Sequence, residues 1–134
     1  MRPNTIVLLI FLSFLQSAAP MLAHHSFSGE FDANKPVKLT GTVTKIEWMN
    51  PHAYFFIDVK DEQTGNTTNW AIELGSPNGL VRLGWSRNSM KIGDMVVVEG
   101  STGRVKPNLA NARSVTLSST GQKLGAGSSE TYTR

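Results

Sequence analysis

The three histidines of the chain are the residues best suited to chemistry, because imidazole is the commonest protein ligand for transition metals. His24 and His25 are adjacent and follow an apolar leader, and His52 lies in an Asn-Pro-His turn between two strand-like segments. If the leader is removed after Ala23, the new α-amino group belongs to His24. That amine, the imidazole Nδ1 of the same residue and one further imidazole suit copper. The sequence therefore predicts a copper-type site formed by His24, His25 and His52.

Other ligand sets are open at this point. If cleavage falls after Leu22, His25 becomes the third residue, and an amine, two backbone amides and its imidazole suit square-planar Cu(II) or Ni(II). Met49, beside the Asn-Pro-His turn, is a soft ligand for Cu(I). In the alternative interpretation the paired histidines are only solvated, and His52 hydrogen-bonds its own turn. Three carboxylates could also ligate, although nothing singles them out: Glu30, Asp32 and Glu47.

The sequence carries no catalytic motif. It contains neither a nucleophile elbow nor a phosphate-binding glycine loop. No pair of carboxylates is placed by spacing as acid and base. We therefore expect a binding protein and not an enzyme.

Residues 1–23 have the composition of a cleavable secretory signal. Arg2 supplies the positive charge, and residues 6–15 form an apolar run that is too short to span a bilayer. Small residues follow before Ala23. We expect export to the periplasm and no stable membrane anchor after cleavage; an uncleaved anchor is the alternative. The absence of cysteine excludes a lipoprotein.

The exported chain has about 110 residues, the size of one domain. It has no cysteine, so its stability must come from a well-packed core without disulfides. Without Arg2, 12 basic residues stand against 10 acidic ones, and the two kinds are interspersed. Such a surface offers no basic stripe for nucleic acid. We expect a monomer whose partner is a metal ion, a small ligand or a protein.

Five strand-like segments follow the leader, at residues 37–48, 53–60, 67–74, 95–99 and 112–117. In the first of them the alternation of apolar and polar residues slips by one after Thr44, which indicates a β-bulge. Before it, residues 24–36 form an amino-terminal arm that Phe27 and Phe31 are expected to dock on the body. Residues 118–134 are rich in Gly, Ser and Thr and predict a disordered tail.

One short helix is predicted between the third and fourth strands. Ser76 is a suitable N-cap, and Pro77 suits the first helical position. Leu80, Val81 and Leu83 would form its apolar edge. This order of elements predicts an all-β domain over residues 37–117, a small five-stranded OB-fold-like Greek-key barrel with its helix between strands three and four. A plain meander sandwich is the alternative.

An OB-fold binds ligands over strands two and three and at the loops that join strands one–two and four–five. His52 falls in the first loop, and Arg104 and Lys106 fall in the second. The alternative to a metal site is therefore a metal-free face that binds a small ligand or a partner protein. It would consist of Trp48, Tyr54, Trp70 and Arg113. A third interpretation is an accessory subunit of a periplasmic enzyme.

Several motifs span nearly the whole exported chain: Ala23-His-His-Ser-Phe27, Gly41-Thr-Val-Thr-Lys-Ile-Glu-Trp48, Asn50-Pro-His52, Asn69-Trp70, Glu73-Leu-Gly-Ser-Pro77 and Ala110-Asn-Ala-Arg-Ser-Val115. Together they resemble those of a family of small exported proteins of Gram-negative bacteria that is catalogued as a domain of unknown function. The resemblance implies location and fold, and brings no activity, cofactor or partner. The residues at its motif positions are His24, His25, Asn50, Pro51, His52, Trp70, Ser76, Pro77, Asn111 and Arg113.

Overall fold

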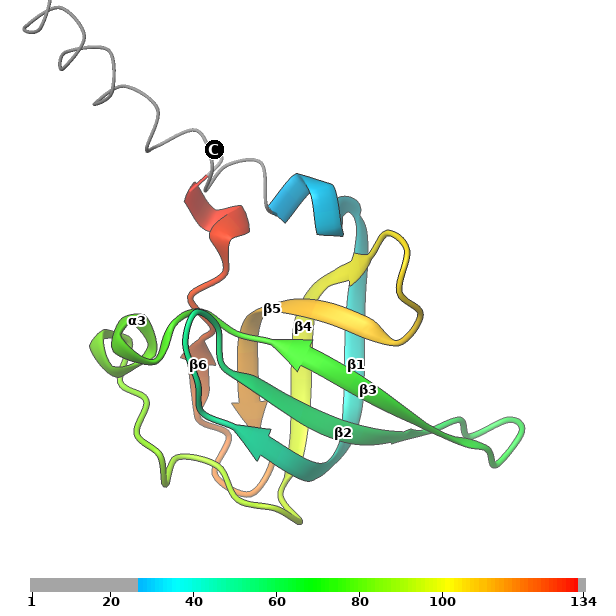
Figure 1. Ribbon diagram of the computed structural model, residues 1–134. Helices are drawn as coiled ribbons and strands as arrows, with labels where there is room; N and C mark the ends of the chain where they lie inside the picture. The colour runs from blue at the N-terminus through cyan, green and yellow to red at the C-terminus, as the bar shows by residue number, and fades with distance from the viewer. Residues whose placement is uncertain (1–26, 133–134) are drawn as a thin grey trace, which may run out of the picture.

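The computed structural model describes residues 27–132, and these residues form the predicted all-β fold. The strands of the described chain lie in one sheet (Figure 1). They are β1 (Phe31–Glu47), β2 (Tyr54–Lys60), β3 (Thr67–Glu73), β4 (Met95–Gly103), β5 (Leu109–Leu117) and β6 (Lys123–Gly125). The helix α3 (Pro77–Arg82) lies between β3 and β4, and the 3-10 helix η1 (Ser129–Tyr132) follows β6.

The strand pairings close into a barrel-like ring. β1 pairs with β2 and β4, β2 pairs with β3, and β4 pairs with β5, all antiparallel. A short parallel pairing between β3 and β5 completes the ring, so its order is β1–β2–β3–β5–β4. This order, with α3 between the third and fourth strands, is the arrangement expected of an OB-fold.

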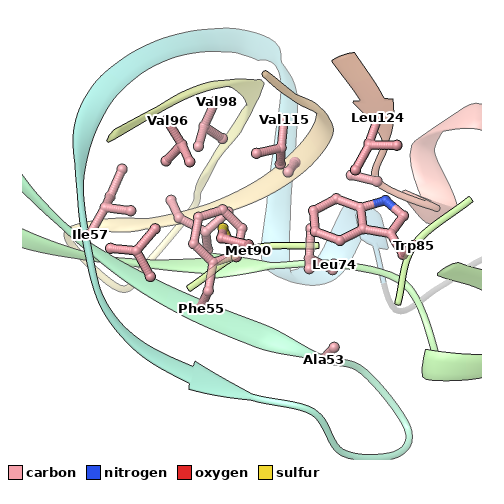
Figure 2. Close-up of a cluster of buried hydrophobic side chains, with 14 of the residues drawn as sticks. Ala53, Phe55, Ile57, Leu74, Trp85, Met90, Val96, Val98, Val115 and Leu124 are labelled. Atoms are coloured by element: carbon pink, nitrogen blue, oxygen red, sulfur yellow. The ribbon is translucent and has the colours of Figure 1, made fainter. Parts of the chain in front are cut away.

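The core lies inside this ring (Figure 2). Phe55 and Ile57 of β2 are fully buried and lie on the same face of the strand. Val96 and Val98 of β4 are buried opposite them, and Val115 of β5 completes the layer. Alternate residues of each strand therefore supply the apolar surface that stabilises the fold, as strand geometry requires.

The bulge predicted in the first strand is present. The pairing of β1 with β2 shifts register between Val43 and Lys45. β1 itself is longer than expected and begins at Phe31, so part of the predicted arm belongs to the sheet. Phe27 and Phe31 are both buried, and their rings stack with centroids 5.5 Å apart. The arm is thus docked by these two aromatic residues, as expected.

The helix α3 begins where the sequence places it. The Ser76 hydroxyl accepts a hydrogen bond from the backbone N–H of Gly79 at 3.2 Å, and Pro77 opens the helix. Its expected apolar edge is only partly correct. Leu80 is buried, whereas Val81 and Leu83 are exposed, because the six-residue helix turns just one side chain toward the core.

The prediction of a disordered tail from residue 118 is wrong for residues 118–132. β6 pairs with β5, and Leu124 is buried beside it. The indole Nε1 of Trp85 donates to the carbonyl oxygen of Gly125 at 2.8 Å, and Gly75 N–H donates to Ala126 O at 2.7 Å. A Cβ at Gly75 would lie 2.6 Å from a backbone oxygen of this segment, so only glycine permits the approach.

Over residues 27–132, no helix combines the length and the apolar character that crossing a membrane requires.

Candidate functional site

A buried carboxylate lies at the point where β3 is paired on both sides. Glu73 is opposite Tyr54 of β2 and opposite Asn111 of β5. Residues opposite each other in a sheet share a face, so the three polar side chains form one row across the closure of the ring. Glu73 is 3% exposed and Asn111 2% exposed.

Both oxygens of the Glu73 carboxylate have partners. The phenol of Tyr54 donates to Oε2, and the side-chain amide of Asn111 donates to Oε1 at 3.1 Å. His52, in the turn before β2, places Nδ1 3.1 Å from the same Oε1. The imidazole remains 38% exposed. One edge of the imidazole therefore faces the buried Glu73 carboxylate, and the rest of the ring is accessible to solvent.

Burial sets the electrostatics of this row. It raises the pKa of Glu73 above its ordinary value, and the hydrogen bond from Tyr54 and the nearby His52 oppose that shift. Burial also raises the pKa of the Tyr54 phenol far above its ordinary value, and the hydrogen bond to Glu73 adds to the effect. The charges of Glu73, Glu30 and Glu47 act on Tyr54 in the same direction. The region around Tyr54 is thus electronegative.

The row continues into the carboxy-terminal segment. The hydroxyl of Ser128, which is 1% exposed, donates to the carbonyl oxygen of the Asn111 side chain. The backbone N–H of Glu130 donates to the Ser128 hydroxyl at 3.2 Å. The carboxylate of Glu130 in turn binds the hydroxyl of Ser101 and the guanidinium of Arg113, both at 3.0 Å. A continuous polar network therefore reaches from His52 to Glu130 and Arg113.

The amino-terminal turn lies against the same site. Residues 27–30 form one helical turn, and Phe27 packs in a cluster with Phe31 and Leu109 that also contacts Tyr54. Arg104, in the loop between β4 and β5, holds this turn from outside. Its Nε donates to Ser28 O at 2.8 Å, and its backbone N–H donates to Glu30 O at 2.8 Å. Phe27, the first described residue, is thereby anchored in the cluster that packs against Tyr54.

The predicted metal ligands divide into two groups. His52 is placed at the site, whereas His24 and His25 lie outside the described residues. Within residues 27–132, no three His, Asp or Glu side chains are arranged to hold a metal ion. The described part of the chain supplies one imidazole, that of His52, beside the Glu73 carboxylate.

The four residues of the predicted metal-free face do not gather at one hollow. Tyr54 and Trp48 share the lining of a small hollow beside Trp85. Trp70 lines an open hollow with Leu39 and Val59, next to the β2–β3 turn. Arg113 lines another with Lys38 and Lys123. These surfaces are separate, although Tyr54 and Arg113 belong to the same polar network.

Four members of this network are not predicted as site residues from the sequence: Glu73, Ser101, Ser128 and Glu130. Along the third strand Glu73 alternates with the apolar residues Ile72 and Leu74, a pattern that points it away from the core, and Ser128 and Glu130 lie in the predicted tail. The motif Glu73-Leu-Gly-Ser-Pro77 was the available signal for Glu73, because it marks an acidic residue at the end of an apolar strand. Asn111 was noted as a motif position without a role.

Comparison with known proteins assigns a family to the chain. The model of a family described as a family of unknown function (DUF6152) matches residues 13–109, well over half of the sequence. No curated protein and no solved structure matches the chain.

Proposed function

The chain belongs to this family of unknown function, DUF6152, and we propose that it is an exported periplasmic protein that binds a copper-type metal ion through His52 and its processed amino terminus. The observation that carries the proposal is the contact between His52 Nδ1 and the buried carboxylate of Glu73. In metal sites a ligand histidine almost always turns its second ring nitrogen toward a carboxylate, a carbonyl or water. The remaining nitrogen, Nε2, is then free to bind the ion.

The charge of Glu73 also favours a cation at this place. Tyr54 and Asn111 are neutral donors, and within residues 27–132 the only basic side chain that pairs with Glu73 is His52. A buried charge is stable when it is paired or lies near a metal ion. A cation on Nε2 of His52 would supply that charge without disturbing the hydrogen bonds of the carboxylate.

The remaining ligands are proposed to come from His24 and His25. Phe27 is fixed in the cluster that contacts Tyr54, and His25 precedes it by two residues. Two residues of extended chain span about 7 Å at most, and three span about 10 Å. We propose that this length of chain brings the α-amino group and imidazole of an amino-terminal His24 to the turn that carries His52.

This ligand set favours copper over hard cations. Imidazoles suit copper, zinc, iron and nickel, and an added amine favours the tetragonal geometry of Cu(II). Glu73 would not be a ligand in this arrangement. It would hold the His52 ring, as outer-shell carboxylates do in metal sites.

The test uses protein expressed with its own leader and recovered from the periplasm, with the mature terminus confirmed by mass spectrometry. Calorimetric titration with Cu(II) should show one site of micromolar or tighter affinity. His52→Ala should weaken it strongly, and a form that begins at Ser26 should weaken it as well. Asn50→Ala, in the same turn, is the matched control and should bind as the parent does.

The outcomes separate the alternatives. Binding that survives His52→Ala but needs the terminus would mean a simple amine-terminal chelate, and would refute a shared site. No binding by the parent protein would refute the metal function altogether. Cleavage at a position that leaves His24 and His25 on the discarded leader would do the same.

A metal-free binding module is the second candidate, and Trp70 favours it. Its half-buried indole faces an open hollow with Leu39 and Val59, and a flat aromatic face suits a small organic ligand or a partner such as a periplasmic enzyme. In a ligand screen by NMR, the indole N–H signal of Trp70 should then respond, and Trp70→Ala should abolish binding. A response confined to His52 would contradict this candidate.

A further inference from the structure

We infer that Ser128 is a positioning residue that fixes the tautomer of His52 from the carboxy-terminal end of the chain. A neutral imidazole carries one proton, and only the nitrogen without it can bind a metal. Whichever group faces Nδ1 therefore decides whether Nε2 is available. In this protein that group is Glu73, and Glu73 is held by buried hydrogen bonds that run through Asn111 to Ser128.

The direction of each hydrogen bond follows from the chemistry of the groups. An ionised carboxylate only accepts, so Asn111 must turn its NH₂ group toward Glu73. The carbonyl oxygen of the same amide then faces Ser128, whose hydroxyl donates to it. The Ser128 oxygen meanwhile accepts from the backbone N–H of Glu130. These contacts orient the amide of Asn111 in one sense.

The orientation of Asn111 reaches His52 through the shared oxygen Oε1. Asn111 Nδ2 and His52 Nδ1 both lie 3.1 Å from this atom. A deprotonated Nδ1 would set its lone pair against the carboxylate, so the proton of the neutral ring belongs on Nδ1. If Asn111 turned over, its carbonyl oxygen would repel Glu73 and displace the carboxylate from His52. Ser128 prevents this.

The tautomer can be measured on the protein without metal, so this part of the inference stands apart from the proposed copper function. Long-range ¹H–¹⁵N correlation spectra identify the protonated ring nitrogen. The spectra are recorded on the neutral ring, at a pH above which the His52 ring signals no longer move. The spectrum of the parent protein should show the His52 proton on Nδ1. A proton found on Nε2 would overturn the inference.

Two variants interrupt the hydrogen bonds between Ser128 and His52 at different positions. Ser128→Ala removes the donor to Asn111, and Asn111→Ala removes the donor to Glu73. Each should shift the His52 signals toward the tautomer protonated at Nε2, with the fold confirmed by circular dichroism. Ser129→Ala removes a neighbouring hydroxyl that takes no part in these hydrogen bonds, and it should leave the spectrum unchanged. If one variant fails to fold, the other still decides: an unchanged His52 tautomer in a folded variant overturns the inference.

The consequence for metal rests on the proposed function. Loss of an outer-shell partner typically lowers metal affinity 10- to 100-fold, so Ser128→Ala should weaken Cu(II) binding by roughly tenfold. Copper binding that is lost in His52→Ala but unchanged in Ser128→Ala would overturn the role of Ser128 and leave the copper function intact. No copper binding by the parent, with the tautomer shifting as expected, would remove the proposed function and leave the positioning role.

Discussion

Arg104 donates from Nε to the carbonyl oxygen of Ser28 at 2.8 Å, and this bond ties the β4–β5 loop to the helical turn that precedes β1. The same guanidinium lies 3.5 Å from the carboxylate of Asp32, and the backbone N–H of Arg104 binds Glu30 O. One residue thus contacts the turn at two places and the start of β1 at a third. The loop between strands four and five holds the amino terminus in addition to offering a surface of its own.

Arg104→Ala should loosen the amino-terminal turn without unfolding the ring. The side chain is 44% exposed, so the lost contacts should lower the free energy of unfolding by about 1 kcal/mol. Hydrogen exchange should become faster for residues 27–31 and stay unchanged in β2. Lys106→Ala, in the same loop, is the control and should leave exchange at residues 27–31 as it was. Equal exchange in all three proteins would show that the arm is held by Phe27 and Phe31 alone.

Tyr54 should resist ionisation in the folded protein. Burial and the hydrogen bond to Glu73 raise the pKa of its phenol, so the folded state favours the neutral form more than the unfolded state does. The stability that this provides is complete below the ordinary value of 10.0 and is lost as the pH rises through the raised pKa.

Alkaline titration of tyrosine absorbance tests this, with Tyr54→Phe identifying the step that belongs to Tyr54. That step should lie well above pH 10.0 and coincide with loss of the native circular dichroism. A step at the ordinary value in the folded protein would contradict the burial of this phenol beside Glu73.

The strands could be predicted because their information is local. Alternation along β2 marks Phe55 and Ile57 as inward, and the slip after Thr44 marks the bulge that the structure shows between Val43 and Lys45. Ser76 and Pro77 start the helix through contacts within four residues of each other. Each of these features needs only neighbouring residues to be recognised.

The candidate site could be predicted only in part, because it depends on pairings between distant segments. Alternation with Ile72 and Leu74 points Glu73 away from the core, yet it is buried because β5 pairs with β3 and closes the ring. Leu124 is too isolated an apolar residue to predict order, and Trp85, which donates to the neighbouring Gly125 O, lies 40 residues before Gly125. His52 was found because its residue type alone indicates chemistry.

The pairing of β6 with β5 should depend on pH through Glu99. The hydrogen bond from Lys123, 2.6 Å away, lowers the pKa of the Glu99 carboxyl below its ordinary value, and Ser114 contributes in the same direction. A lowered pKa gives a stability that is present above 4.5 and is lost as the pH falls through the value in the folded protein.

NMR titration of the side-chain carboxyl carbons measures this shift. Lys123→Met should return the pKa of Glu99 toward 4.5, whereas Lys91→Met, on the β4 approach, should not change it. If Glu99 already titrated at its ordinary value in the parent protein, the Lys123–Glu99 contact would not hold β6 in solution.

Trp85→Phe should release the carboxy-terminal segment more than it disturbs the core. The indole ring is 3% exposed and packs in the main core, and its Nε1 donates to Gly125 O at 2.8 Å. Phenylalanine keeps most of the apolar contact but leaves that buried oxygen without its donor, which should cost about 1 to 3 kcal/mol. Because Gly125 belongs to β6, hydrogen exchange should accelerate over residues 123–128 before it does in β2 or β4. The same variant should shift the His52 signals in the direction expected for Ser128→Ala, since both act on the segment that holds Asn111.

Trp48→Phe provides the matched control. The Trp48 indole only borders the core, and among the hydrogen bonds of residues 27–132 it makes none with β6. A uniform loss of protection across all strands in Trp85→Phe would contradict a local role for this hydrogen bond and would make the indole a general core residue.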